Sequence, residues 1–141
     1  MIVGIGTDIV EVARFESWAD APESRLLKIF SLSELAVCLT SDGRYVPERL
    51  AVRFAAKEAF FKALSATLTR FKLTDHIFSF MFSCQNINIT TSEWGVPVLV
   101  VNWDGFEEKI QAKIPPLQVH VSLSHEKSSA IAFVVISREF C

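Results

Sequence analysis

The stretch that decides the fold of this chain runs Arg53-Phe54-Ala55-Ala56-Lys57-Glu58-Ala59-Phe60-Phe61-Lys62-Ala63. It lies within a segment, from about Glu48 to Leu68, that is rich in Ala, Leu, Lys, Glu and Phe and contains neither Gly nor Pro. Because most of these residues are good helix formers, the segment predicts one long helix. At about 100° per residue, its larger apolar side chains share one side, which we expect to face the core: Leu50, Phe54, Phe61, Leu64 and Leu68.

A neighbouring side of this predicted helix carries small residues, which would let another segment approach closely: Ala51, Ala55, Ala59 and Ala66. Glu58 and Lys62 project from that side, one turn apart. One interpretation is an ordinary surface ion pair, which contributes about 0.3 kcal/mol. The other is a site, because a carboxylate that borders Phe54 and Phe61 is partly desolvated and needs a cation, for which a metal ion would serve.

The rest of the chain predicts a single α+β domain over residues 1–141, with a mainly antiparallel sheet packed against the long helix. Ser31 and Glu34 form a capping-box pattern that predicts the start of a second helix. The segment Thr69–Ser83 has no clear assignment. The other expected elements are strands at Met1–Val10, Gln85–Thr91, Pro97–Trp103, Leu117–Leu123 and Ala130–Ile136, and helices at Glu11–Trp18, Ser31–Leu39 and Asp104–Ala112.

Composition excludes several classes of protein. The net charge of −2 argues against a general nucleic-acid binder. The N-terminus lacks the basic start of a signal peptide, and every apolar run is shorter than the roughly 20 residues of a membrane helix. The three cysteines are far apart and form no CxxC pair, so neither a disulfide framework nor a zinc site is indicated. We therefore expect a cytoplasmic protein with reduced thiols, no membrane partner and no nucleic-acid partner.

Asp8 is unusual because it interrupts an otherwise apolar strand, directly after Gly4 and Gly6. Asp is disfavoured within strands, and a buried carboxylate is costly unless it is paired. Either Asp8 caps the helix that follows, or it joins Glu58 in holding Mg²⁺ beside phosphate groups. Mg²⁺ is commonly bound by one or two carboxylates, with water and substrate supplying the other ligands.

Two further features fit an anionic ligand. The loop Ser122–Ser129 concentrates hydroxyls, an imidazole and an ammonium group at a strand end, although a solvated hairpin tip would look the same. Arg53, Lys57 and Lys62 add positive charge along the long helix, and the Lys57 stem is expected to run along apolar surface to reach solvent. The tripeptide Gly95-Val96-Pro97 predicts a turn whose backbone a ring or phosphate could approach.

Taken together, these segments resemble the acyl carrier protein synthases, the small single-domain group of the 4′-phosphopantetheinyl transferases. The resemblance spans nearly the whole chain and keeps the family's order. The segments that carry it are Gly4-Ile5-Gly6-Thr7-Asp8-Ile9-Val10, Arg53 to Ala63 as quoted above, Gly95-Val96-Pro97, and Val119-His120-Val121-Ser122-Leu123-Ser124-His125.

This resemblance implies a reaction. A serine hydroxyl of an apo acyl carrier protein attacks the β-phosphate of coenzyme A, and adenosine 3′,5′-bisphosphate leaves; the expected setting is fatty acid biosynthesis. Asp8 and Glu58 would ligate Mg²⁺, and Lys62 would stand near the pyrophosphate. The base that takes the serine proton is left open, and our hypothesis is Glu58 acting through a water molecule.

The resemblance also implies contacts with the rest of coenzyme A. Arg53 would favour its 3′-phosphate, Ser124 and His125 would approach the phosphates, and the turn from Gly95 to Pro97 would border the adenine or a phosphate. The family commonly forms trimers with active sites across subunit interfaces, so we expect a homotrimer.

Two points depart from the family pattern. The family has a shorter, glycine-containing connection where this chain has Ser65–Ser83, which lacks glycine and is rich in Phe. The basic patch expected to dock the acidic carrier protein, Arg14 with Arg25 and Lys28, is diluted by Glu16, Asp20 and Glu23.

Two other functions remain open from the residues. One is a non-catalytic coenzyme A-binding module, which need not retain Asp8, Glu58 and Lys62 together. The other is a metal-dependent phosphohydrolase, which would usually show more clustered carboxylates or histidines.

Overall fold

The long helix is the centre of the fold. In the computed structural model, which describes residues 1–139, this helix, α3, spans Pro47–Arg70. Pro47 occupies its first turn, where a missing N–H costs nothing. Beyond its C-terminus Lys72 adopts a left-handed conformation, with φ of 58°. The prediction of one long helix is confirmed, and the helix exceeds the predicted range by one residue at its start and two at its end.

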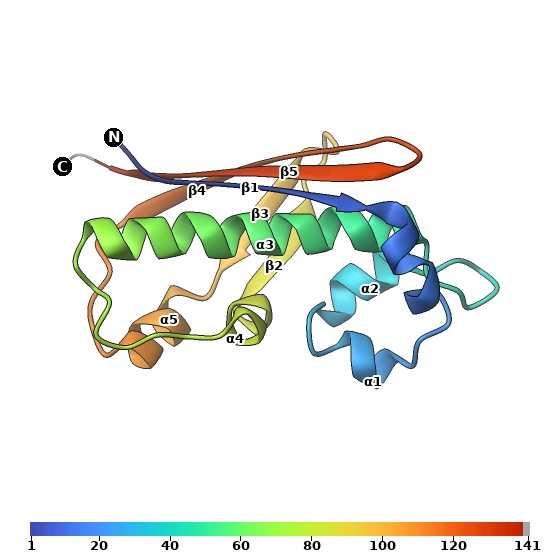
Figure 1. The fold of residues 1–141 in the computed structure, drawn as a ribbon, viewed down its shortest axis with the longest axis horizontal. Helices are drawn as coiled ribbons and strands as arrows, with labels where there is room; N and C mark the ends of the chain where they lie inside the picture. Colours follow the sequence, from blue (N-terminus) through green and yellow to red (C-terminus); the bar gives the residue numbers. More distant parts are fainter. Residues whose placement is uncertain (140–141) are drawn as a thin grey trace.

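A three-stranded antiparallel sheet covers one side of α3 (Figure 1). Its strands are β1 (Ile2–Glu11), β5 (Ser129–Arg138) and β4 (Leu117–His125), and their order is β1-β5-β4. Asp8 pairs with Ala132, and Ser124 pairs with Ile131. The predicted antiparallel sheet on one long helix is therefore confirmed, with β5 as the central strand.

The remaining elements lie on the other sides of α3. Strands β2 (Ile87–Thr91) and β3 (Pro97–Val101) form a separate antiparallel hairpin. The short helices are η1 (Val12–Trp18, a 3₁₀-helix), α1 (Glu23–Leu26), α2 (Leu32–Cys38), α4 (Phe80–Gln85) and α5 (Trp103–Ile110). The capping box of Ser31 and Glu34 is present at the start of α2. Within residues 1–139, no helix combines the length and apolar character needed to cross a membrane.

Strand β1 lies unusually close to α3, and two glycines make that approach possible. A Cβ atom added to Gly6 would lie 1.9 Å from the backbone oxygen of Ala59, and one added to Gly4 would lie 2.3 Å from that of Ala63. Such contacts are shorter than any side chain tolerates. Of the small residues predicted to admit another segment, Ala59 contacts β1, as does Ala63, and these contacts fix the position of Asp8 beside the helix.

Two details of the predicted helix surface were wrong. Phe61 is only partly buried, whereas Phe60 is fully buried. Ala66 is exposed and does not belong to the contact side. The unassigned segment after residue 69 ends α3, crosses an aromatic cluster at Phe78 and enters α4.

Candidate active site

The site is centred on the contact between β1 and α3. The Lys62 ammonium group donates hydrogen bonds to the Asp8 carboxylate, with Nζ 3.0 Å from Oδ1, and to the backbone oxygen of Thr7, also at 3.0 Å. The Asp8 side chain is 15% exposed and that of Lys62 is 50% exposed, so the pair sits at the edge of the interior. The structure therefore brings together an acidic residue of the first strand and a basic residue of the long helix.

Glu58 belongs to the same cluster. Partial burial raises the pKa of its carboxyl group, and the nearby Asp8 carboxylate raises it further; Lys62 and then Arg14 act in the opposite direction. The second Asp8 oxygen, Oδ2, is buried without a hydrogen-bond partner. Two carboxylates thus share a single adjacent lysine, and one buried oxygen lacks a donor.

This arrangement fits a divalent cation. An unsatisfied buried carboxylate oxygen is costly, and a cation beside it would remove the cost. Among residues 1–139 there is no group of three or more His, Cys, Asp or Glu side chains placed to hold a metal ion. Asp8 and Glu58 would therefore supply only part of a coordination shell, which suits Mg²⁺, an ion that retains water and takes substrate oxygens.

Arg14 lies at the mouth of this site. Its guanidinium group stands 5.0 Å from the centre of the Phe54 ring and 5.7 Å from that of Phe15, in cation–π geometry. Phe54 precedes Glu58 by one turn of α3. The residue expected to dock the carrier protein is consequently close to the carboxylate expected to act in catalysis.

Arg25, within α1, and Lys28, two residues after its end, are also exposed. Asp20, expected to dilute this surface, is instead paired with Arg44, with 2.9 Å between Arg44 Nε and Asp20 Oδ1. Glu16 and Glu23 remain exposed.

Arg53 lies away from Lys62. The two residues are nine positions apart, which places them on opposite sides of an α-helix at about 100° per residue. The Arg53 guanidinium donates to the Arg49 backbone oxygen at 3.1 Å and lies near the Cys38 thiol, whose pKa burial raises to about 11. Its Nε is buried without a partner. One chain does not bring Arg53 to the Asp8 cluster.

Ser124 pairs with Ile131 and is on the opposite face of the sheet from Asp8, whereas His125, at the end of β4, pairs with buried Ala130 on the α3 side. Asp8 points toward α3, whereas Ile9 is 68% exposed on the outer face. An outer hollow of about 450 Å³ is lined by Ile9, Ser124, His125, Glu126, Ser129 and Ile131. Ser124 therefore faces away from its own chain's carboxylates, and His125 lies at the end of the sheet, level with Val10 and not with Asp8.

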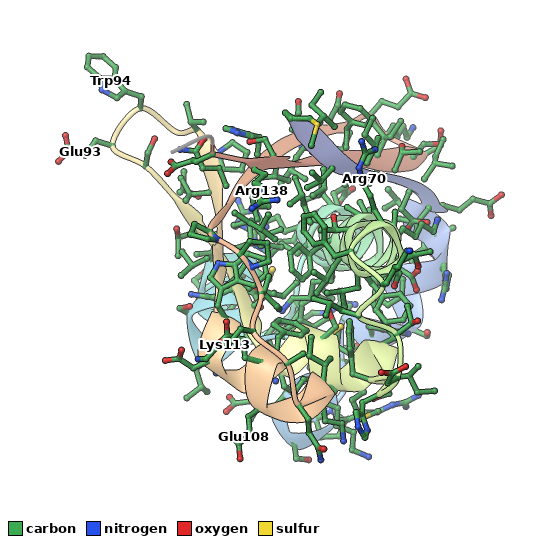
Figure 2. All side chains as sticks on the ribbon, turned by 90° about the vertical axis from the view of Figure 1, so that its left-hand side faces the viewer. Arg70, Glu93, Trp94, Glu108, Lys113 and Arg138 are labelled. Atoms are coloured by element: carbon green, nitrogen blue, oxygen red, sulfur yellow. The ribbon has the colours of Figure 1, made fainter. Side chains whose placement is uncertain are left out.

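Gly95 and Pro97 lie at the β2–β3 turn, where Gly95 adopts φ of 75°. This hairpin neighbours β4, and β1 is at the other edge of the sheet. Figure 2 shows Trp94 projecting from the turn, away from the body of the molecule, and it is 90% exposed. Within one chain, the predicted coenzyme A contacts thus occupy separate surfaces.

The prediction that Lys57 reaches solvent at the surface of the long helix is wrong. Its side chain is fully buried, and its Nζ lies 2.9 Å from Glu34 Oε1. It also donates to the backbone oxygens of Cys84 at 3.0 Å and Ile87 at 3.3 Å. Lys57 therefore joins α2, α3, α4 and β2 in the interior and does not reach a phosphate at the surface. The capping pattern marked Glu34 but gave no sign that its second oxygen accepts from the Ile89 backbone N–H.

This chain resembles known proteins over nearly its whole length. A family model of the 4′-phosphopantetheinyl transferase superfamily matches residues 4–134. A holo-[acyl-carrier-protein] synthase of Treponema denticola is 38% identical over 139 residues, covering 96% of this chain and 98% of the relative. The corresponding protein of Halothermothrix orenii is 39% identical over 136 residues, covering 96% and 97%.

Solved structures agree with this similarity. A holo-(acyl-carrier-protein) synthase from Bacillus anthracis, in complex with coenzyme A (3′,5′-ADP), superposes with a TM-score of 0.67 at 29% identity and covers 99% of both chains. The synthase of Helicobacter pylori, in complex with coenzyme A, gives a TM-score of 0.65 at 29% identity and covers 94% of this chain and 99% of that one.

Proposed function

This chain belongs to the 4′-phosphopantetheinyl transferase superfamily, and we propose on that basis that it is a Mg²⁺-dependent enzyme acting at the β1–α3 contact. It transfers the 4′-phosphopantetheine group from coenzyme A to a serine of apo acyl carrier protein and releases adenosine 3′,5′-bisphosphate. The observation that supports this site most directly is the cluster of Asp8, Glu58 and Lys62, with a buried carboxylate oxygen that lacks a donor.

Asp8 and Glu58 would hold the magnesium ion through their carboxylate oxygens. When bound, the ion neutralises charge on the pyrophosphate and aligns it for in-line attack. The Lys62 ammonium group, half exposed beside Asp8, is placed to donate to an oxygen of the departing phosphate. Glu58 would receive the serine proton through an intervening water molecule.

Arg14 would position the carrier protein. Its exposed guanidinium beside Phe54 offers a cation to an acidic partner within reach of Glu58, and the exposed Arg25 and Lys28 would add further positive charge for the same partner. A positive surface of this kind increases the rate of encounter with an acidic protein, and the gain falls as salt rises.

The separated coenzyme A contacts support a homotrimer. Four large apolar side chains are exposed on the outer sheet face, at 52% for Ile5, 68% for Ile9, 42% for Ile131 and 45% for Phe133. An apolar patch of this kind is typical of a protein interface. If a neighbouring subunit covers it, Ser124 and His125 of one chain would complete the Asp8 cluster of another.

This assembly predicts complementation between inactive variants. Asp8→Asn and His125→Ala proteins, each impaired alone, should regain activity when unfolded together and refolded as mixed oligomers. Recovery to no more than the sum of the separate activities would contradict sites shared between subunits.

We also propose a cytoplasmic location, supported by the free, buried thiols of Cys38 and Cys84.

The central experiment is mass spectrometry of an apo carrier protein after incubation with this protein, coenzyme A and Mg²⁺. We expect a mass gain of one phosphopantetheine group, and no mass gain when EDTA is present during the reaction. Glu58→Gln should abolish turnover while keeping the fold, and Glu108→Gln, an exposed carboxylate on α5 (Figure 2), serves as its control. Near-normal turnover of Glu58→Gln at saturating Mg²⁺ would refute the role of Glu58. Binding of coenzyme A without transfer would indicate the non-catalytic module.

A further inference from the structure

Phe80, the first residue of α4, packs against two aromatic side chains of α3. Helix α4 lies on the side of α3 that faces away from the three-stranded sheet (Figure 1). The centre of the Phe80 ring is 5.6 Å from that of Phe54 and 5.8 Å from that of Phe61, and both contacts are edge-to-face. Ser79 fixes the start of α4, because its hydroxyl oxygen accepts a hydrogen bond from the Phe82 backbone N–H at 3.0 Å. The helix cap and the two rings together hold Phe80 in place.

The two rings of α3 place Phe80 level with Glu58. Phe54 precedes Glu58 by four residues and Phe61 follows it by three, so the three side chains share one side of the helix. Seven residues of an α-helix rise about 10 Å, and a single ring that contacts both ends of this interval lies near its middle. Phe80 therefore covers α3 at the turn that carries Glu58.

The same turn carries Lys57, on the other side of the Phe80 ring. Successive residues of an α-helix are turned by about 100°, so Lys57 and Glu58 diverge to either side of the row formed by the two α3 rings. On its side, Lys57 is fully buried and paired with a carboxylate of α2. On the other side, Glu58 lies near Asp8 and Lys62. The ring of Phe80 thus stands between a buried cation and a carboxylate of the active site.

This separation has a consequence for the Glu58 carboxylate. The residue is only partly buried, and a glutamate side chain has several staggered rotamers. A partly desolvated carboxylate is attracted to a nearby cation, and the attraction grows where water is excluded. A rotamer that turned toward Lys57 would take the carboxylate oxygens away from Asp8. Misplacement of a reacting group by about 1 Å can cost about 100-fold in rate.

We propose that Phe80 is a positioning residue for Glu58: its ring blocks the rotamers that turn this carboxylate toward the interior and holds it toward Asp8. Phe80 itself contacts neither the substrate nor the metal ion in this role, and it acts only through Glu58. The inference rests on the proposed function, in which Glu58 acts in catalysis, and it adds the residue that keeps Glu58 in the active geometry.

The test compares Phe80→Ala with Phe82→Ala. Phe82 is a second aromatic residue of α4 and is also partly buried, but the partners of its ring are Phe78 at 6.1 Å and Phe106 at 5.7 Å. Both substitutions should lower the midpoint of urea unfolding, because each removes a packed ring. Phe80→Ala alone should lower kcat about tenfold at saturating Mg²⁺, with KM for coenzyme A changed by less than about twofold.

Binding of Mn²⁺ provides a readout that does not require turnover. Mn²⁺ prefers the same carboxylate and water ligands as Mg²⁺, and electron paramagnetic resonance distinguishes its free and bound forms. Because displaced oxygens ligate poorly, Phe80→Ala should raise the Kd of Mn²⁺ about tenfold, whereas Phe82→Ala should leave it unchanged. Phe80→Leu keeps much of the apolar volume and should recover most of the loss in kcat and in Mn²⁺ affinity.

Two results would overturn the proposal. One is an equal kcat and an equal Mn²⁺ affinity for the two alanine variants, after correction for the fraction of folded protein, which would make Phe80 a packing residue only. The other is a rise in KM for coenzyme A with kcat unchanged, since that split indicates loss of substrate binding. If the wild-type protein modifies no carrier, the proposed function fails, and Mn²⁺ binding still tests the position of Glu58. If it modifies the carrier and the two alanine variants behave alike, only the role of Phe80 fails.

Discussion

Replacing Lys57 with Met tests whether this lysine acts inside the protein or at its surface. The Lys57 and Glu34 side chains are both fully buried, and their charged atoms lie 2.9 Å apart. Met has a similar length and no charge, so the change removes the cation while nearly preserving the packed volume. The variant leaves a buried carboxylate without its cationic partner, and it also removes the donor to the Cys84 and Ile87 backbone oxygens.

The expected loss is large compared with the stability of a small domain. Breaking a buried ion pair from one side costs about 3–5 kcal/mol, because the remaining charge stays desolvated. The total free energy of unfolding of natural domains is about 5–15 kcal/mol. With a urea m-value of about 2 kcal/mol per M, the midpoint of unfolding should fall by about 1.5–2.5 M.

Two comparisons isolate the cause. Lys62→Met removes another lysine of α3 that pairs with an Asp, but this lysine is half exposed, so we expect a loss below about 1 kcal/mol. Adding Glu34→Gln to Lys57→Met removes the uncompensated charge while an amide oxygen can still accept from the Ile89 or Ser31 backbone N–H. The double variant should therefore be more stable than Lys57→Met alone.

The measurement is urea unfolding followed by circular dichroism, with coenzyme A binding measured in parallel. If Lys57→Met costs no more than Lys62→Met and mainly weakens coenzyme A binding, Lys57 acts on phosphate as the sequence suggested, and the structural argument is wrong. The ion-pair explanation would also be refuted if the stability losses of Lys57→Met and Glu34→Gln simply added in the double variant.

Three further predictions follow from the contacts described above. Gly6→Ala should destabilise the protein by about 3 kcal/mol or more in urea unfolding, because its methyl group would overlap the Ala59 backbone. The comparison is Gly43→Ala, whose methyl group would meet no atom within 4 Å; because Gly43 has φ of 83°, this change should cost about 1 kcal/mol. In EDTA, Glu58→Gln should raise the melting temperature near neutral pH. The raised pKa of Glu58 gives the wild-type protein a stabilising contribution at acid pH, and this contribution is lost as pH rises through that pKa. The gain in melting temperature should therefore disappear near pH 4, and its absence at pH 7.5 would contradict the direction of the pKa shift. Burial raises the pKa of the Cys84 thiol to about 12, so peptide-level mass spectrometry should find it unmodified by iodoacetamide at pH 7.5 in the folded protein and alkylated in urea.

The local elements were predictable because short-range chemistry fixes them. The Ala-, Glu- and Lys-rich composition specified α3, and the alternation in β4 and the turn before β5 specified a hairpin. The capping box at Ser31 marked the start of α2 from two residues three positions apart. The four-residue α1 was missed because so short a helix carries almost no periodic signal.

The order of motifs along the chain was enough to place it in its family and to single out Asp8, Glu58 and Lys62. That these three residues meet was decided by tertiary structure, through the glycines that let β1 approach α3. No comparable signal marks the Glu34–Lys57 pair, because its members are far apart along the chain and each resembles an ordinary surface residue.

What the sequence determined by itself was the set of elements and the chemical groups they carry, since helix, strand and cap preferences act between residues a few positions apart. Tertiary structure alone decided which of those groups share a site. The helical repeat of α3 already separates Arg53 from Lys62, whereas the packing of the strands put Ser124 and Asp8 on opposite faces of one sheet. The physical reason is that burial and charge pairing depend on distances between segments, and those distances exist only once the chain has packed.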